Sequence, residues 1–236
     1  MSLVKKIQLT CPHCGEDFEA EIWETVNTSL DPDMFDAVRR CEVFKVTCPR
    51  CGESGLLERA FLYNQMQDNY MLHFLPRSAN DEEFEQILRF YSGEDSDNLL
   101  SSLIRSKKVG EVRIVRTIPR FLEKLAILDA GLDDRVVEIE KLFTWLHISD
   151  KDDTFAKRKL ESYFVKNEEK DSYLIVFVDL ETEEKLSAPF SQKLYDAMFQ
   201  IYGQEIRNSE KPDVIVDENW ARQFLEKSRQ EPHQES

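Results

Sequence analysis

The chain has 236 residues, a formal net charge of −15, and a composition that is 41% hydrophobic and 33% charged. This composition supports a buried core and excludes a disordered or fibrous chain. The longest apolar run, residues 173–178, is far shorter than the roughly 18 residues of a membrane-spanning helix. The first residues, MSLVKKIQLTCP, contain no apolar segment of a signal peptide. We therefore expect a cytoplasmic protein without membrane association, in which thiols stay reduced.

The first predicted segment is a β domain over residues 1–77. Apolar and polar residues alternate at Ile7 and Leu9 and again over residues 18–26, which is typical of half-buried strands. Asp31 followed by Pro32 predicts the start of a short inserted helix, with Asp31 as its cap. The other elements of this segment are strands at residues 44–46, 56–63 and 70–75 and a turn at residues 65–69.

The second predicted segment, residues 80–148, is mainly helical. Gly131 ends a helix that begins at Ile118, and the acidic residues that follow it predict the start of the next helix. These two helices form an αα-hairpin whose apolar stripe is expected in the core, with a homodimer seam as the alternative. The other elements are helices at residues 81–91 and 99–104 and a strand at residues 112–115.

The third predicted segment is an α+β domain over residues 154–229, preceded by a charged linker at residues 149–153. Its apolar residues follow the two-residue period of a strand in some stretches and the 3.6-residue period of a helix in others. They are strands at residues 155–165, 173–180 and 214–216 and helices at residues 191–202 and 218–227.

The acidic charge is spread along the whole chain, with a net charge of −4 over residues 1–79, −4 over 80–149 and −7 over 150–236. Nucleic-acid binding depends on cations that neutralise phosphates, so we do not expect it as the main function. Residues 105–124 are the exception, with a net charge of +5. We interpret them as a solvated strand and helix face; the alternative is a docking face for an acidic partner.

The cysteines carry the clearest chemistry. Residues 11–15, CPHCG, recur as residues 48–52, CPRCG, with thirty-three residues between the two C-x2-C pairs. Proline fixes φ at the start of each turn, and glycine accepts a positive φ at its exit. Two such turns supply four sulfur ligands, which predicts one Zn²⁺ per chain in a tetrahedral site. The predicted ligands are Cys11, Cys14, Cys48 and Cys51.

Three alternatives concern this site. Iron binds the same four-sulfur geometry, so the ligands do not identify the metal. A C-P-H-C sequence also occurs in thiol–disulfide oxidoreductases, where it begins a helix. Here each pair precedes or follows alternating strand residues, which disfavours redox catalysis. A closed four-sulfur site leaves no position for a catalytic water and is therefore structural.

No other residue forms a recognisable catalytic set. Cys41 lies outside both pairs and is expected to be a small buried side chain. His13, His73 and His147 are expected to be structural or exposed, and His233 lies in the C-terminal tail. No Walker A, G-x-G-x-x-G, G-x-S-x-G or H-E-x-x-H motif is present. The sequence therefore favours a non-enzymatic protein, with no catalytic residue assigned.

The doubled CPxCG motif and a later segment running from FLEK to DAGLDDR together resemble the CpXC domain family of bacteria and archaea. The resemblance covers about residues 7–140, and it implies that the four paired cysteines are the metal ligands. It implies no activity, because the family has no established one.

These patterns predict an α+β protein with a zinc-ribbon-like β domain, a helical segment containing an αα-hairpin, and a C-terminal α+β segment. The predicted function is a zinc-binding interaction or assembly module with a protein partner. Nucleic-acid binding is the alternative, followed by thiol–disulfide exchange.

Overall fold

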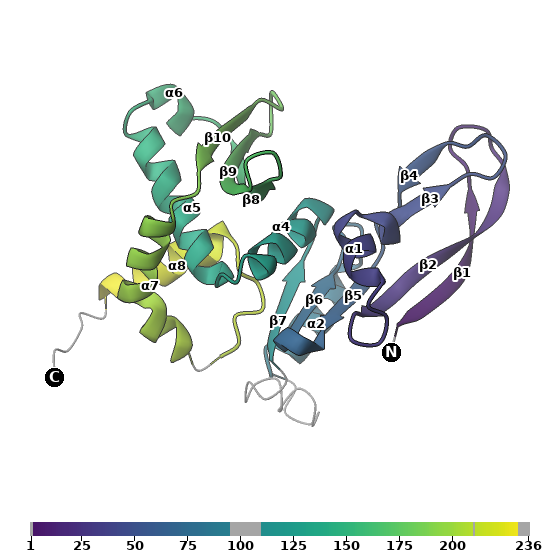
Figure 1. Cartoon of the computed structure of the whole chain (residues 1–236), viewed down its shortest axis with the longest axis horizontal. Helices are drawn as coiled ribbons and strands as arrows, with labels where there is room; N and C mark the ends of the chain where they lie inside the picture. Colours follow the sequence, from purple (N-terminus) through teal and green to yellow (C-terminus); the bar gives the residue numbers. More distant parts are fainter. Residues whose placement is uncertain (1, 95–109, 210, 231–236) are drawn as a thin grey trace. The chain divides into compact units, whose positions relative to one another are not determined.

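The computed structural model describes residues 2–94, 110–209 and 211–230 (Figure 1). It is a mixed α+β structure, which confirms the predicted class at that level. Backbone contacts divide the chain into two compact units. The first unit is Met1–Phe121 with Lys211–Val214, and the second is Leu122–Glu210 with Ile215–Ser236. The three predicted domains, 1–77, 80–148 and 154–229, stay a prediction about independent folding.

The first unit is built on a five-stranded sheet with the order β1-β2-β5-β6-β7. Antiparallel pairing joins β1 to β2 and β5 to β6, whereas β2 with β5 and β6 with β7 are parallel pairs. A separate two-stranded ladder joins β3 to β4. The strands are β1 (Leu3–Thr10), β2 (Asp17–Asn27), β3 (Lys45–Thr47), β4 (Ser54–Leu56), β5 (Phe61–Gln65), β6 (Tyr70–Phe74) and β7 (Glu111–Val115).

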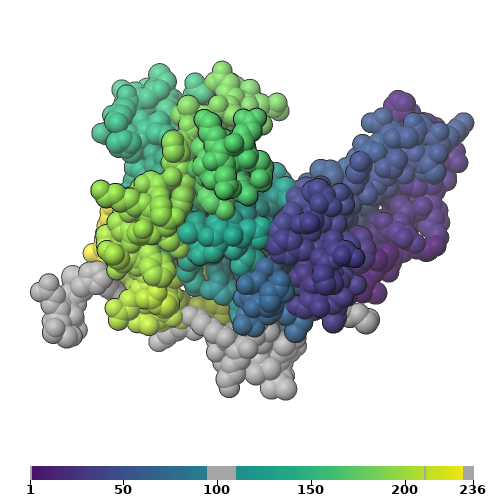
Figure 2. Space-filling view, viewed as in Figure 1, coloured from purple at the N-terminus to yellow at the C-terminus, as the bar shows by residue number. Residues whose placement is uncertain are grey.

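Two hairpins of the first unit extend away from the rest of its sheet. Strand β2 pairs with β5 only from Thr25 to Asn27, so its earlier residues pair with β1 alone. The β3–β4 hairpin lies beside this free end of the β1–β2 hairpin (Figure 1). In the space-filling view the tips of both hairpins, purple and blue, lie against each other (Figure 2).

An aromatic cluster forms the core of the first unit. Phe121 is fully buried, and its ring lies edge-on to Phe44 with centroids 5.5 Å apart. Phe61 and Phe74 also contact Phe44 edge-on, at 5.2 and 5.5 Å. Edge-on aromatic pairs of this kind add stabilisation beyond the burial of their area. The cluster ties the short β3 region to β5, β6 and the first turn of α4 (Ile118–Asp129).

The short helices of the first unit correct one prediction. Helix α1 (Met34–Arg39) begins after Asp33, which makes no side-chain cap, so it starts later than the predicted Asp31 cap. The predicted turn at residues 65–69 is confirmed as η2 (Met66–Asp68) closed by Asn69 at a φ of 49°. The remaining elements are η1 (Glu42–Phe44) and α2 (Asp81–Tyr91), the latter capped by Asn80.

The second unit combines helices with an antiparallel sheet of the order β10-β9-β8. The two helices of the predicted αα-hairpin are confirmed: Gly131, at a φ of 69°, follows the end of α4, and the Asp133 side chain caps α5. The elements that follow α4 are α5 (Asp134–Ser149), α6 (Asp153–Ala156), β8 (Leu160–Asn167), β9 (Ser172–Asp179), β10 (Lys185–Pro189), α7 (Gln192–Arg207) and α8 (Glu218–Gln230).

The core of the second unit surrounds α5. Val136 and Ile139 are fully buried, in one cluster with Tyr195 of α7 and Leu225 of α8. The apolar stripe of the αα-hairpin is therefore used inside the protein, as expected. A second cluster places Phe155 edge-on to Phe177 with centroids 5.5 Å apart, beneath the three-stranded sheet.

Three strand predictions need correction, and one strand was not predicted. The predicted strand 56–63 is divided, because β4 pairs with β3 while β5 pairs with β2 and β6. The predicted strand 155–165 begins only at Leu160, since Asp152 caps the short helix α6 before it. Strand β10 was not predicted, and residues 214–216 form no strand although Ile114 donates a backbone hydrogen bond to Val214.

The predicted helix 99–104 lies outside the described residues. Among the helices that the structure describes, none combines the length and apolar character needed to cross a membrane.

Candidate metal centre

The two C-x2-C pairs form the tips of the two extended hairpins. The residue before each pair bonds to a residue after it: Thr10 Oγ1 donates to Asp17 at 2.6 Å, and the Thr47 and Ser54 hydroxyls lie 2.8 Å apart. Neither pair begins a helix. The repeated sequence therefore produces the same local structure twice, a tight turn between antiparallel strands.

Backbone hydrogen bonds close each turn in the same way. Gly15 N–H donates to Cys11 O at 2.9 Å, and Gly52 N–H donates to Cys48 O at 3.0 Å. Both glycines have positive φ values, 71° and 75°, which L-residues rarely adopt. The prediction that glycine provides the exit of each turn is confirmed.

The tips bring four sulfur atoms together. All four lie within 4.8 Å of one another, in the set Cys11, Cys14, Cys48 and Cys51. Two Sγ···Sγ distances across the hairpins, Cys11 to Cys51 and Cys14 to Cys48, are 3.7 Å. A tetrahedral ion with metal–sulfur bonds of about 2.3 Å requires sulfur atoms about 3.8 Å apart. A disulfide requires about 2.05 Å, so the four thiols are free and spaced for a metal ion.

Burial differs between the members of each pair. Cys11 and Cys48, the first of each pair, are 4% and 3% exposed, whereas Cys14 is half-buried and Cys51 is exposed. Such a set encloses an ion on its inner side and leaves its outer side near solvent. Four sulfur donors fill a tetrahedral coordination sphere, which matches a structural site and leaves no position for a substrate or a catalytic water.

Backbone donors favour the thiolate form at Cys48. Hydrogen bonds from the N–H groups of Cys51 and Arg50, together with those from the Cys51 and Cys11 thiols, lower the pKa of Cys48 to about 7 against the opposing effect of burial. At Cys14 the N–H of Glu16 acts in the same direction, but burial and hydrogen bonds from the other three thiols outweigh it and raise the pKa to about 12. The donor set therefore fits a cation, which would replace the protons that the thiols otherwise share.

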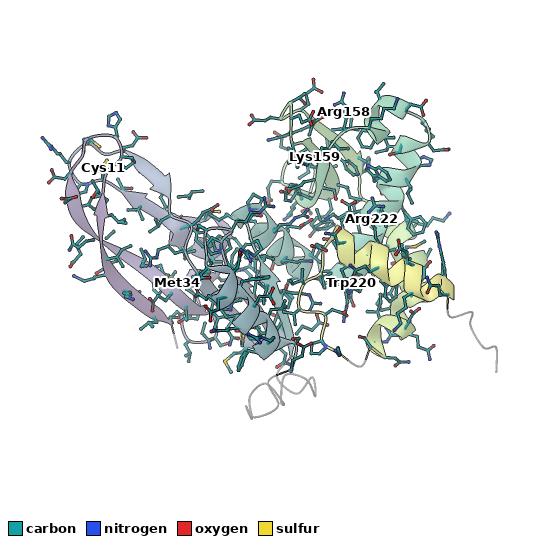
Figure 3. All side chains as sticks on the ribbon, turned by 180° about the vertical axis from the view of Figure 1, so that it is seen from behind. Cys11, Met34, Arg158, Lys159, Trp220 and Arg222 are labelled. Carbon is teal, nitrogen blue, oxygen red and sulfur yellow. The ribbon has the colours of Figure 1, made fainter. Side chains whose placement is uncertain are left out.

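An ion pair connects the two tips outside the sulfur cluster. Arg50 Nη1 of the second pair lies 3.1 Å from Glu16 Oε2, just after the first pair. Both side chains are exposed, at 64% and 41%, so the pair contributes little to stability alone. Figure 3 labels Cys11 at this end of the first unit, where both tips are on the exterior.

The other cysteine and histidine candidates lie elsewhere. Cys41 is half-buried at a φ of 60°, and burial raises its pKa. His13 is exposed in the first turn, and His147 contacts Lys151 at 2.9 Å at the end of α5. His73 lies on β6 edge-on to Tyr91, and burial lowers its pKa to about 4. Within the described ranges, the four-cysteine set is the one group of three or more metal-binding side chains.

Two cations of the basic stretch 105–124, Arg113 and Lys124, are buried rather than part of the predicted solvated face. Arg113 is 2% exposed, and its guanidinium donates to Val112 O and Asp213 O at 3.0 and 2.8 Å. Lys124 is also 2% exposed and lies 2.7 Å from Asp134. Residues 105–109 of this stretch lie outside the described part of the chain. The prediction is wrong for Arg113 and Lys124 because acceptors distant in sequence surround both side chains.

A buried ionic cluster in the second unit was missed by sequence reasoning. Lys141 Nζ lies 2.7 Å from Glu123 and 2.8 Å from Glu138, and all three side chains are at most 2% exposed. Lys124 Nζ also donates to Val216 O at 2.7 Å. A detectable signal exists, since charged residues recur at helical spacing on the apolar face of α5. The cluster comprises Glu123, Lys124, Asp134, Glu138 and Lys141.

A comparison with known families accords with this geometry. The family model described as CpXC protein matches residues 9–141, which is more than half of the chain. No curated protein and no solved structure matches the chain. The matched range contains both hairpin tips and the five residues of the buried ionic cluster, and it agrees with the range of about 7–140 over which the sequence resembles the family. The chain therefore belongs to the CpXC family.

Proposed function

We propose that the two hairpin tips bind one Zn²⁺ per chain through Cys11, Cys14, Cys48 and Cys51 in a structural, zinc-ribbon-like site. The observation that carries this proposal is the 4.8 Å limit on all distances between the four sulfur donors. Their spacing suits tetrahedral coordination, and four thiolates favour zinc or iron over hard cations such as Mg²⁺. Zinc is preferred because structural four-cysteine sites with two C-x2-C pairs are typical of zinc.

The role that we propose for the protein is a non-enzymatic interaction or assembly module in the cytoplasm, where thiols stay reduced. A metal holding two tips together creates a rigid, exposed surface at one end of the first unit. Arg50 and Glu16, exposed and paired across the tips, give that surface polar groups that a protein partner can recognise. Nucleic-acid binding through Arg113 is disfavoured, because that guanidinium is buried and its donors are used internally.

Metal analysis combined with thiol counting tests the proposal. We expect one zinc per chain in the native protein and four thiols protected from a thiol reagent. Cys51→Ser removes one proposed ligand and should lower the bound zinc and expose the remaining paired thiols. Cys41→Ser is the matched control, because this cysteine is outside the sulfur cluster and should leave zinc content unchanged. Freshly purified protein with paired disulfides, or with four reactive thiols and no metal, would contradict the proposal.

A further inference from the structure

The second unit contains a cavity that the metal centre does not involve. Its volume is about 260 Å³, and it lies between α5, the start of β8, β9 and α8. Small-molecule sites usually measure about 300–1,000 Å³, so this cavity suits a compact ligand rather than a dinucleotide. All of its lining residues belong to the second unit.

Cations predominate in the lining although the protein as a whole is acidic. Two acidic residues, Glu138 and Glu218, face four basic ones in the wall of the cavity. The chain as a whole has a net charge of −15. A local excess of positive charge in a concave site concentrates small anions. The basic residues are Lys141, Arg158, Lys159 and Arg222.

These cations differ in how they are held. Lys141 is buried and lies 2.7 Å from Glu123 and 2.8 Å from Glu138, so carboxylates of the buried ionic cluster compensate its charge. Arg222 is held by Glu218 at 2.6 Å and lies 5.2 Å from the Trp145 ring centre. Both arrangements leave the rim of the cavity as the place where a ligand charge would be recognised.

The rim has one uncommitted cation. Lys159 is exposed and forms no ion pair with any residue in the described ranges. Its neighbour Arg158 lies 3.8 Å from the buried carboxylate of Asp179, and it also pairs with Glu184 at 2.8 Å, where both partners are exposed, at 40% and 65%. Exposed pairs of this kind contribute about 0–1 kcal/mol, so an incoming anion can compete for the arginine. Figure 3 labels Arg158 and Lys159 near the start of β8 and Arg222 on α8.

Apolar side chains complete the wall. Trp145 and Leu142 of α5 face the cavity together with Leu160 of β8 and Phe177 of β9. The wall therefore combines four apolar side chains with six charged ones. The apolar side chains can bind the body of an organic ligand, and the charged ones can orient its polar end.

We propose that this cavity binds a small organic anion, with a carboxylate or phosphate group at Lys159, Arg158 and Arg222 and a compact apolar body against Trp145. The two arginines present planar donors that match both anionic groups, and Lys159 supplies an uncompensated charge. The proposal is independent of the metal centre, because no cysteine lines the cavity.

Titration of the full-length, metal-loaded protein with three probes tests this site. The probes are benzoate, phenyl phosphate and the cation benzylamine, followed through the Trp145 indole signal in NMR spectra assigned with Trp145→Phe. We expect a saturable shift with benzoate or phenyl phosphate, which identifies the anionic group preferred, and no saturable shift with benzylamine. Absence of saturation with both anions, or equal binding of benzylamine, would overturn the proposal.

Two charge reversals separate a specific contact from the general field. Lys159→Glu should weaken anion binding by about tenfold or more, the effect of losing one charge-assisted contact. Lys157→Glu makes the same change of charge two residues earlier, outside the lining, and should keep the affinity within about twofold. Equal weakening by both variants would show a diffuse electrostatic effect and reject the site. Arg222→Gln, which keeps a polar side chain over Trp145, provides a second reduction of affinity should Lys159→Glu alter the fold.

Discussion

The hairpin tips of the first unit and the helical core of the second unit differ in what holds their backbones in place. Strand β1 is largely exposed, and all three residues of β4 are exposed, so the tips bury few apolar side chains. Around α5, by contrast, apolar side chains from four helices are buried in one cluster. The second unit can therefore include buried charges, whereas the tips depend on the metal site that we propose at their four sulfur atoms. A small region without a hydrophobic core needs a cross-link such as a metal ion or a disulfide, and a region with a core does not.

Removal of the metal should produce the largest effect. Metal binding contributes about 10–16 kcal/mol of apparent free energy in small zinc-finger peptides. We expect EDTA to expose residues 1–76 to protease first, while residues 154–229 stay protected. Limited proteolysis with mass spectrometry of the fragments, supported by circular dichroism, measures this difference. Cys41→Ser with its metal retained is the control. If EDTA leaves the digestion of the N-terminal region unchanged, the tips do not depend on a metal and the contrast between the two units is wrong.

Disruption of the buried ionic cluster should produce the next largest effect. Lys141→Met leaves the carboxylates of Glu123 and Glu138 without their shared buried cation. We expect a loss of about 3–5 kcal/mol in the free energy of unfolding. Urea denaturation followed by tryptophan fluorescence measures it.

The matched control for that experiment is Lys193→Met, which changes an exposed lysine of α7. Its effect should stay within about 0.5 kcal/mol. If both variants lose the same small amount, the ionic cluster contributes no more to the second unit than a surface charge does.

A smaller and pH-dependent effect is expected at Glu140. Burial raises its pKa to about 7, although its carboxylate accepts a hydrogen bond from Ser191 N–H at 2.8 Å. Asp196 raises the pKa further. Between pH 4.5 and 7 the folded protein keeps a proton that the unfolded chain has released, so the free energy of unfolding falls as the pH rises.

Glu140→Gln removes this dependence and keeps an oxygen acceptor for Ser191. We expect the variant to be more stable than the parent by up to about 3 kcal/mol at pH 8 and nearly equal to it at pH 4. Thermal or urea unfolding at both pH values measures the difference. Glu226→Gln, at an exposed carboxylate of α8, should show no such pH dependence. A variant that is less stable at pH 8 than at pH 4 relative to its parent would contradict the reasoning.

Much of the local structure was predictable from the chain. The Gly131 helix end, the Asp133 cap and the doubled turns depend on residues within a few positions of each other. The predicted strand boundaries were wrong where pairing with a strand distant in sequence decided them. Residues 56–63 are an example, because they are divided between two ladders. The sulfur set was predictable because its motif is duplicated, whereas the cavity around Lys159 was not, because its walls come from four elements far apart in sequence.

Turn chemistry, capping and hydrophobic period are properties of short stretches, so amino-acid order alone specified both cysteine turns and the two helices on either side of Gly131. Charge burial is different, because the solvation of a lysine depends on which distant groups surround it. Arg113 and Lys141 carry the same formal charge as any surface cation, and only the packed chain placed carboxylates and carbonyls around them. Tertiary packing therefore decided where the buried charged side chains lie. It also formed the cavity that we propose as a site for a small anion.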